Sequence, residues 1–238
     1  MKKSLVIPTY NEAEVIGETL FSLRSAFNQQ PDKDGWEIIV VDNASTDSTA
    51  DVVTAIGDSR IHLVRLEEKG KGRAVRRGFA VCSGDIVGFT DADLSVSPDQ
   101  VVSAFLMVQN DPTVLIVGSR FHPESNMPDR EWWRLASSVL FNLLARIIVG
   151  VVSTDTQCPL KVMTKDAGLT MLRTRENTWF FDLEFLALST HFRKIIKEIP
   201  VLWTEHRYLN RKSKLTLLDS ARAIFAMFRI RRRIHDID

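Results

Sequence analysis

Short apolar segments alternate with segments of helical periodicity through the first half of the chain. Each apolar segment is short enough for a buried strand and stops at polar or turn-forming residues. The pattern predicts strands at Leu5–Pro8, Trp36–Val41, Ile61–Leu66, Asp85–Thr90 and Val114–Val117. It predicts helices over Glu12–Phe27, from Ser45–Thr49 to about Ile56, near Arg73–Val81 and from Pro98 to about Gln109. Strands separated by helices form right-handed βαβ units, so we expect an α/β fold whose mostly parallel sheet has helices on both faces.

Polar residues gather where these predicted strands end. Thr9–Glu12 follows the first strand, and Asp42 ends the second. Asp91 and Asp93 follow the fourth strand, and Arg120 follows the fifth. Because ligands of open parallel sheets bind beyond the carboxyl ends of the strands, the sequence predicts a ligand site at this edge.

The second half of the chain has a different pattern. Trp132–Val152 is long and apolar with polar interruptions, and Thr154–Pro159 is a polar loop. We expect a helix over Asn177–Ser189, a strand over Lys194–Val201 and a basic amphipathic helix over Leu215–Ile234. No internal repeat or low-complexity linker separates these segments, so the sequence predicts one domain with C-terminal elaborations.

The composition is that of an ordinary globular protein. The 238 residues are 45% hydrophobic and 26% charged, which excludes a disordered or collagen-like chain. Lys and Arg total 31 against 30 Asp and Glu, and a net charge of +1 gives no reason to expect nucleic acid as a partner. Two cysteines, Cys82 and Cys158, are too few for a disulfide framework, and no CxxC or HExxH motif indicates zinc or redox chemistry.

Two further features bear on a membrane. Pro8 ends the first apolar run too early for a signal peptide, and no long uncharged apolar run predicts a spanning helix. We therefore expect a cytoplasmic chain, soluble or peripheral. The segment from Arg207 to Arg233 contains nine Lys or Arg residues and one acidic residue, Asp219. Such a helix fits an anionic membrane surface, and a surface helix packed on the domain fits equally well.

The motif Asp91-Ala92-Asp93 is a candidate metal site. Two carboxylates one residue apart in a turn can approach one hard cation, and Mg²⁺ or Mn²⁺ prefers such oxygen ligands. A metal there would neutralise the charge of a departing nucleoside diphosphate. A solvated acidic turn has the same sequence, and the position at a strand end is what favours the metal.

Three other segments have both a binding and a structural interpretation. Asp42 could accept hydrogen bonds from a base or ribose, or could form an Asx turn with its neighbours. Glu12 could bind a ribose, or could complete the first turn of a helix. Gly70-Lys71-Gly72 places flexible backbone beside cations, as a phosphate near a helix N-terminus requires, although the spacing of a Walker loop is absent. A solvated basic helix would give the same pattern.

Arg120 and Arg134 are candidates for a second phosphate site. A guanidinium group matches phosphate oxygens with two parallel hydrogen bonds. Arg134 follows Trp132 and Trp133, and aromatic residues next to arginine are typical of a membrane-interface belt. The alternative for each arginine is an exposed ion pair.

Taken together, these segments resemble family 2 glycosyltransferases of the GT-A fold. The resemblance rests, in order and spacing, on Val6–Glu12, Val40–Asp47, Lys69–Gly72, Asp91–Asp93 and Gly118–Arg120. It extends from about Leu5 to Leu218. Within the family, four later segments are similar to the dolichyl-phosphate β-glucosyltransferases among the polyprenyl-phosphate sugar synthases: Asp155–Cys158, Phe181–Glu184, Trp203–Glu205 and Ser213–Leu215.

The resemblance implies a role for each matching residue. The nucleoside pocket would be lined by Pro8, Tyr10, Glu12, Val40 and Asp42. The metal, Mg²⁺ or Mn²⁺, and the diphosphate would be held by Asp91 and Asp93, with Ser95 at the position of a third ligand. Ala92 and Lys71 would lie beside the donor. The lipid phosphate would be held by Arg120, Arg134 and Ser138, and Lys214 would close over the donor diphosphate.

The resemblance also implies an inverting transfer of a hexose from a nucleotide sugar to a polyprenyl or dolichyl phosphate. The enzyme would be peripheral, at the cytoplasmic face of a membrane. The loop Asp155–Cys158 favours UDP-glucose over GDP-mannose as the donor. In this interpretation residues 1–120 form the nucleotide-sugar-binding half of a single domain, residues 121–210 the acceptor-binding half, and residues 211–238 a membrane-interface helix.

Several other functions are compatible with the sequence. A GDP-mannose-dependent enzyme would share the general plan. A family 2 enzyme acting on a glycan hydroxyl would need a carboxylate base, for which Asp182 or Glu184 is a candidate. A sugar nucleotidyltransferase would need a glycine-rich basic loop after the first strand, where this chain has Pro8–Glu12. A membrane-bound protein that binds a nucleotide without turnover is the non-enzymatic alternative.

Overall fold

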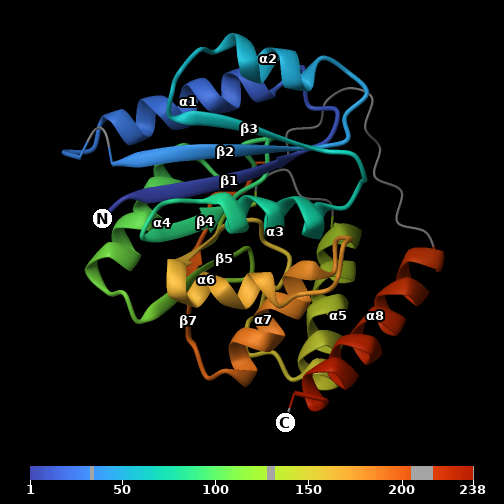
Figure 1. The fold of residues 1–238 in the computed structure, drawn as a ribbon. Helices are drawn as coiled ribbons and strands as arrows, with labels where there is room; N and C mark the ends of the chain where they lie inside the picture. The colour runs from blue at the N-terminus through green and yellow to red at the C-terminus, as the bar shows by residue number, and fades with distance from the viewer. Residues whose placement is uncertain (33–34, 128–131, 205–216, 238) are drawn as a thin grey trace.

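The computed structural model describes residues 1–32, 35–127, 132–204 and 217–237, which form one seven-stranded sheet covered by helices (Figure 1). The strands are β1 (Lys3–Thr9), β2 (Trp36–Asn43), β3 (Ile61–Leu66), β4 (Ile86–Phe89), β5 (Val114–Ser119), β6 (Lys161–Thr164) and β7 (Ile195–Pro200). The helices are α1 (Ile16–Asn28), α2 (Thr49–Ala55), α3 (Lys71–Val81), α4 (Pro98–Asn110), α5 (Trp132–Val149), α6 (Lys165–Leu172), α7 (Phe181–His191) and α8 (Leu217–His235).

The sheet has the order β3-β2-β1-β4-β6-β5-β7. Every neighbouring pair is parallel except that β6 runs antiparallel to both β4 and β5. The predicted α/β fold with a mostly parallel sheet is therefore confirmed.

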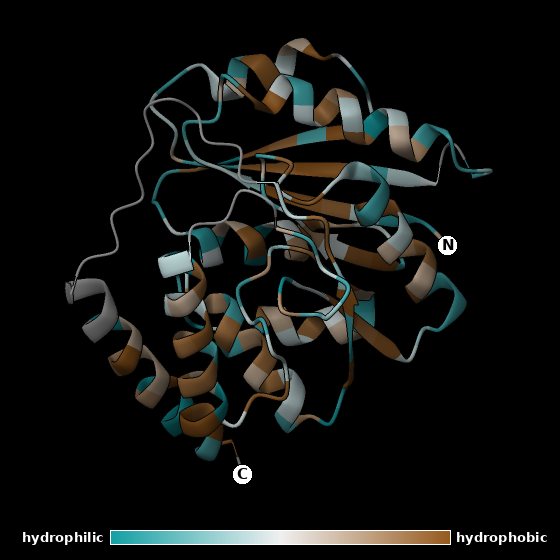
Figure 2. Ribbon diagram, turned by 180° about the vertical axis from the view of Figure 1, so that it is seen from behind, coloured by the Kyte–Doolittle hydropathy of each residue, from teal (hydrophilic) through white to brown (hydrophobic). Residues whose placement is uncertain are grey.

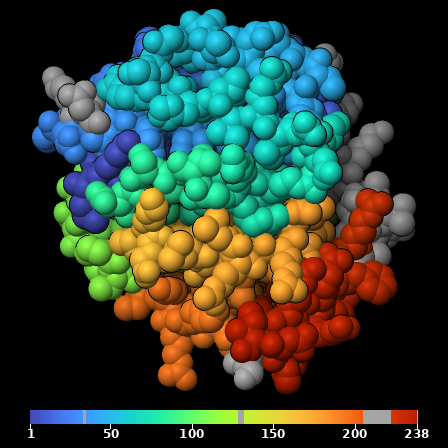
Figure 3. Space-filling view, viewed as in Figure 1, coloured from blue at the N-terminus to red at the C-terminus, as the bar shows by residue number. Residues whose placement is uncertain are grey.

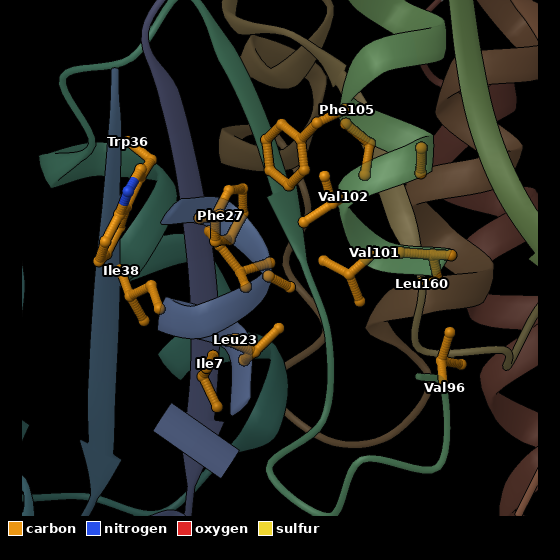
Figure 4. Packing of buried hydrophobic residues seen from close by; sticks show 14 of the residues in the cluster. Ile7, Leu23, Phe27, Trp36, Ile38, Val96, Val101, Val102, Phe105 and Leu160 are labelled. Carbon is orange, nitrogen blue, oxygen red and sulfur yellow. The ribbon is translucent and has the colours of Figure 1, made fainter. Parts of the chain in front are cut away.

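Successive residues of the central strands contribute to two different cores. Leu5 and Ile7 of β1 pack in the core that α1 and α4 complete, whereas Val6 between them packs in the core formed with α3, α6, α7 and α8. In the first core, drawn in Figure 4, Phe27 stacks on Trp36 with ring centres 5.5 Å apart. Because helices cover both faces, the middle parts of these strands are continuous apolar runs, which are brown in Figure 2.

The structure differs from the predicted elements mainly between the polar loop and α7. Neither β6 nor α6 is predicted, and α7 begins at Phe181 rather than Asn177. The strand is only four residues long and opens with Lys161, whose charged side chain is fully buried beside Asp182. A lysine at a buried strand position contradicts the usual pattern, so only the tertiary partner reveals the strand.

The predicted basic helix is confirmed as α8, which packs against α5 and α7. It forms one margin of the molecule in the space-filling view (Figure 3). Ion pairs hold its inner side, since Arg229 lies 2.6 Å from Glu176, and Arg233 lies 3.0 Å from Glu176 and 3.1 Å from Glu184. Its last turns are thereby fixed to the segment that precedes α7.

Candidate active site

The loops that follow β1 and β2 lie side by side because Thr9 is paired with Asp42 in the sheet. The Asn11 backbone N–H donates to Ser45 Oγ at 3.0 Å, and the Thr46 N–H donates to Asn11 Oδ1 at 2.8 Å. The Ser45 N–H also donates to Asp42 Oδ1 at 3.0 Å, so the Asp42 carboxylate holds the turn formed by its own neighbours, which was the structural one of its two interpretations. These contacts build one rigid wall from two loops.

The other residues expected to line the nucleoside pocket occupy different positions at this wall. The Tyr10 hydroxyl contacts the Lys69 ammonium, which lies 4.1 Å from the centre of the Tyr10 ring. Pro8 lies opposite Val41 in the sheet, and the Glu12 carbonyl accepts the first hydrogen bonds of α1. The Val40 side chain is packed in the core with α1, so a nucleoside could meet only its backbone.

Lys71 and Asp91 form the central ion pair at the carboxyl edge of the sheet. The Lys71 Nζ lies 2.6 Å from Asp91 Oδ1. Burial alone would lower the pKa of Lys71, but the charges of Asp91 and Asp182 outweigh it and raise that pKa above its ordinary value. The Lys71 ammonium therefore stays charged. It lies beside Asp91, where the negative charge of the acidic motif attracts cations.

Two glycines, Gly70 and Gly72, lie on either side of Lys71 at the start of α3. Gly70 has a φ of 156°, and a Cβ there would come within 2.6 Å of the Asn177 carbonyl oxygen. The Gly70 N–H donates to Asn43 Oδ1 at 2.7 Å, and the Gly72 N–H donates to the Asn177 oxygen at 3.0 Å. Glycine is thus required at this close approach, which starts α3 at Lys71.

Asp93 lies in a turn next to this ion pair. Its Oδ1 accepts the Ser95 backbone N–H at 3.0 Å, and the buried Ala92 between the two acids accepts a hydrogen bond from Thr19 through its carbonyl. Burial, followed by the negative charge of Asp91, raises the pKa of Asp93 above its ordinary value. A bound cation would offset both effects.

These oxygen donors fit Mg²⁺ or Mn²⁺ in chemistry and charge. In the described part of the chain, no group of three or more His, Cys, Asp or Glu side chains gathers to hold a metal by itself. An ion held by Asp91 and Asp93 would therefore complete its shell with water and substrate oxygens. The position of the Lys71 ammonium beside Asp91 indicates that positive charge is favourable there.

Arg120 is buried at the end of β5 and is held by Asp155 from the polar loop. Its Nε donates to Asp155 Oδ2 at 2.7 Å and its Nη2 donates to Oδ1 at 2.8 Å. Burial alone would lower the pKa of Arg120, but the charge and hydrogen bonds of Asp155 raise it, with a smaller contribution from Asp91. The Trp203 ring lies under the guanidinium at 4.8 Å, and Nη1 is the nitrogen that Asp155 does not engage.

Arg134 and Ser138 lie one turn apart on α5, on the helix face that also carries Asn142. The Asn142 Oδ1 accepts hydrogen bonds from the backbone N–H and hydroxyl of Thr156, at 2.8 and 2.9 Å. Thr156 is the neighbour of Asp155, the partner of Arg120. The face of α5 that was expected to bind phosphate is thereby connected to the loop that orients Arg120.

Several residues of the site had no role assigned from the sequence. Asp155 and Thr156 were known only as part of a motif, and Asn142 and Lys161 had no signal at all. The Lys161 Nζ donates to the Thr156 and Cys158 carbonyls and to Asp182 Oδ1 at 2.7 Å. Burial, followed by Asp155, raises the pKa of the Cys158 thiol to about 12, so this thiol is not a nucleophile at neutral pH.

Lys214, expected to close over the diphosphate, lies outside the described residues, as does the motif Ser213–Leu215. The two carboxylates considered as a base are both buried and paired. Asp182 contacts Lys161, and Glu184 accepts the Arg175 and Glu176 backbone N–H groups at 2.7 Å and pairs with Arg233.

This sheet order, with an acidic motif after β4 and cations at the ends of neighbouring elements, defines the class of GT-A proteins. Solved structures share the fold. One is glucosyl-3-phosphoglycerate synthase from Mycobacterium tuberculosis in complex with Mn²⁺, UDP-glucose and phosphoglyceric acid. It superposes with a TM-score of 0.71 at 22% identity, over 97% of this chain and 80% of that chain.

The chain belongs to glycosyl transferase family 2, whose family model matches residues 4–168. A dolichyl-phosphate beta-glucosyltransferase of Trichomonas vaginalis is 30% identical over 85% of this chain and 64% of its own length. The human dolichyl-phosphate beta-glucosyltransferase is 29% identical over 85% of this chain and 67% of its own length. An undecaprenyl-phosphate 4-deoxy-4-formamido-L-arabinose transferase of Salmonella choleraesuis is 29% identical over 87% of this chain and 61% of its own length. The chain thus spans about two thirds of the relatives that it matches, and the expected resemblance to this family is confirmed.

Proposed function

We propose that this protein transfers glucose from UDP-glucose to the phosphate of a polyprenyl or dolichyl lipid, with inversion at the anomeric carbon. The names of the relatives support the lipid phosphate as acceptor and glucose as the sugar. The observation that carries the proposal is that two cationic groups lie at one edge of the sheet, Lys71 at 2.6 Å from Asp91 and Arg120 held by Asp155 at the end of β5. One reaction that needs two anions brought together is transfer between a diphosphate and a phosphate.

The donor diphosphate would lie at the acidic motif. Mg²⁺ or Mn²⁺ held by Asp91 and Asp93 would supply positive charge to it as negative charge develops. Lys71, held 2.6 Å from Asp91, supplies a second positive charge on the side of α3. The wall formed by the loops after β1 and β2 would receive the nucleoside.

The acceptor phosphate would bind at Arg120, Arg134 and Ser138. Asp155 engages two nitrogens of Arg120 and fixes the plane of the guanidinium, which leaves Nη1 to donate to a phosphate oxygen. That oxygen attacks the anomeric carbon while the bond to the nucleoside diphosphate breaks and the electron pair leaves with the diphosphate. The second pKa of a phosphate monoester is about 6, so the nucleophile is largely ionised at neutral pH and needs no base.

The state of the two candidate bases supports this acceptor over a glycan hydroxyl. Asp182 is paired with Lys161 and Glu184 with Arg233, and both carboxylates are buried. A carboxylate held by a cation and by backbone N–H groups is poorly placed to remove a proton from a sugar hydroxyl. Charge neutralisation and positioning would then supply the catalysis.

The location we propose is the cytoplasmic face of a membrane, with α8 and α5 at the surface of the lipid. In the described part of the chain one helix, α5, is long and apolar enough to cross a membrane. Its Asn142 and Ala145 are buried against the domain, and its outer side exposes Val139, Leu140, Leu143 and Ile147. A helix with one side on the protein and an apolar outer side fits a position in the plane of the interface.

The proposed activity is tested by incubating the purified chain with labelled UDP-glucose or GDP-mannose, Mg²⁺ or Mn²⁺, and vesicles that contain a polyprenyl phosphate. We expect a labelled lipid from UDP-glucose. Asp91→Asn and Asp93→Asn should each lower the rate on the order of a hundredfold, because each removes a carboxylate that would hold the metal whose positive charge balances the leaving group.

The matched control is Asp99→Asn, which neutralises an exposed acid at the start of α4. It should leave the rate unchanged. Transfer at the wild-type rate by both motif variants would contradict the role of the acidic motif. If a labelled lipid formed only from GDP-mannose, the donor would be GDP-mannose and the proposed UDP-glucose would be wrong.

A further inference from the structure

Trp179 is a large aromatic residue that the core does not use. Its side chain is 66% exposed, although it immediately precedes the buried start of α7. The Lys71 Nζ lies 4.7 Å from the centre of its ring. Since one face of the indole is covered by this ammonium and most of the side chain is exposed, the opposite face is open to a ligand.

Contacts of Trp179 and of its neighbour Phe180 reach elements of both proposed phosphate sites. On one side, the Lys71 ammonium that covers its ring lies 2.6 Å from Asp91. On the other side, the next residue, Phe180, stacks on Phe141 of α5 with ring centres 6.3 Å apart. Trp179 therefore lies beside the ammonium at the acidic motif, and its neighbour contacts the helix that carries Arg134 and Ser138.

A second aromatic residue, Tyr10, contacts the same segment, Lys69–Lys71. Lys69 and Lys71 each lie over an aromatic ring, Lys69 over Tyr10 and Lys71 over Trp179. Tyr10 belongs to the wall proposed for the nucleoside, after β1. Trp179 lies next to α7. The two rings therefore lie at the two lysines on either side of Gly70, and Tyr10 is the ring nearer to the proposed nucleoside wall.

The backbone that carries Trp179 is held firmly in place. Two nitrogens of Arg76 contact the Glu176 carbonyl, at 2.7 Å, and the Asn177 side chain. The Gly72 N–H donates to the Asn177 carbonyl, and Arg229 of α8 holds the Glu176 side chain through two hydrogen bonds of 2.6 and 2.7 Å. An exposed ring on a fixed backbone is a preorganised contact surface.

We propose that Trp179 contacts the substrate, and that the open face of its ring stacks on the hexose ring of the nucleotide sugar. This inference rests on the proposed function. A pyranose whose hydroxyls are equatorial presents C–H groups on its faces, and these carry slight positive charge that matches the negative face of an indole. The ring thereby orients the anomeric carbon toward the acceptor and selects a hexose by its shape.

The test compares the binding of UDP-glucose with that of UDP, each with Mn²⁺ and without lipid, by titration calorimetry on the full chain. Trp179→Ala should lower the affinity for UDP-glucose roughly three- to tenfold, because an aromatic contact of this kind contributes a binding free energy of that size. The same substitution should leave the affinity for UDP within about twofold of the wild-type value. Trp179→Phe should retain most of the affinity for UDP-glucose. The control is Trp132→Ala, which removes an 80% exposed tryptophan at the start of α5 and should change neither affinity.

Other outcomes overturn the inference in distinguishable ways. An equal loss for UDP and UDP-glucose would mean that Trp179 only positions Lys71. Unchanged nucleotide affinities with a raised KM for the polyprenyl phosphate would assign the ring to the lipid tail. If the wild-type chain bound neither nucleotide, the proposed function itself would fail before any variant is compared. If the donor assay selects GDP-mannose, the same comparison is made with GDP-mannose and GDP.

Discussion

Arg120 and Asp155 are buried together as an ion pair. The carboxylate of Asp155 is fully buried and engages two guanidinium nitrogens as well as the Arg120 backbone N–H, at 2.9 Å. The charge and hydrogen bonds of Arg120 hold the pKa of Asp155 below its ordinary value, although burial alone would raise it. Such a pair defines one orientation of the arginine, which a phosphate site requires.

Asp155→Asn should lower the free energy of unfolding by about 3 kcal/mol, because it leaves the Arg120 guanidinium buried without its counter-charge. Urea denaturation at pH 7 measures this loss. The control, Asp166→Asn, removes an exposed carboxylate that lies 3.7 Å from Lys194 and should change stability by less than about 0.5 kcal/mol. Equal stability of the two variants would show that the buried pair is not a structural requirement.

At the scale of elements, the inserted strand β6 and the terminal helix α8 have the largest consequences for the site. β6 separates β4 from β5, so the acidic motif and Arg120 follow strands that are not neighbours in the sheet. Lys161 is paired with both Phe89 and Val117 and reaches Asp182 from there. The width of one strand thereby divides the donor side of the edge from the acceptor side.

The outer face of α8 should bind the membrane. Phe225 and Phe228 are 73% and 55% exposed, whereas Met227 and Ile230 are buried against the domain. Changing both phenylalanines to serine should weaken cosedimentation with anionic vesicles at least about tenfold, since each inserted ring contributes roughly 1.5–3 kcal/mol. Higher salt should weaken wild-type binding further by screening the basic residues of the helix.

The control for this prediction lies on the opposite side of the sheet. Phe21 of α1 is 64% exposed, and α1 packs in the core that α8 does not enter. Phe21→Ser should leave vesicle binding unchanged. A loss of binding as large in Phe21→Ser as in the double variant would show that the membrane does not meet the molecule at α8.

At the scale of the whole molecule, stability at acidic pH depends on a buried carboxylate in β2, at the opposite end of that strand from Asp42. Glu37 in β2 accepts hydrogen bonds from the Ser4 hydroxyl at 2.6 Å and the Ser83 backbone N–H at 2.7 Å, and it lies 2.9 Å from the Lys2 ammonium. Burial alone would raise its pKa, but these hydrogen bonds lower it from 4.5 to about 2. The carboxylate therefore ties β1, β2 and the segment before β4 together while it is ionised.

Because the folded pKa of Glu37 lies below the unfolded one, its contribution is complete above about pH 4.5 and disappears as the pH falls toward 2. The wild-type chain should be more stable than Glu37→Gln by up to about 3 kcal/mol at pH 7. Denaturant unfolding at pH 7, 5, 4 and 3 should show this difference shrinking below pH 4.5. A constant difference would contradict the assignment to this ionisation.

The order of hydrophobic and polar residues by itself determined the α/β class and six of the seven strands, all except β6. It also determined the edge of the sheet at which the candidate site lies. The predicted strand Lys194–Val201 matches β7, and the predicted strands before it match β1 to β5. This was possible because continuous apolar runs and helical periodicity are local properties of the chain. The family motifs likewise lie in short segments, so Asp91 and Asp93 could be proposed as site residues before any contact was known.

Only the tertiary structure decided which side chains face one another. Residues about 20 to 110 positions apart form the contacts that matter here, and no local pattern encodes the pairing of Arg120 with Asp155 or of Lys161 with Asp182. Nothing in the sequence distinguishes Trp179 from the other aromatic residues. Its proposed role follows from the exposure of its ring beside Lys71 in the structure. The physical reason is that burial, desolvation and charge pairing depend on what the fold brings near a group, which local sequence does not contain.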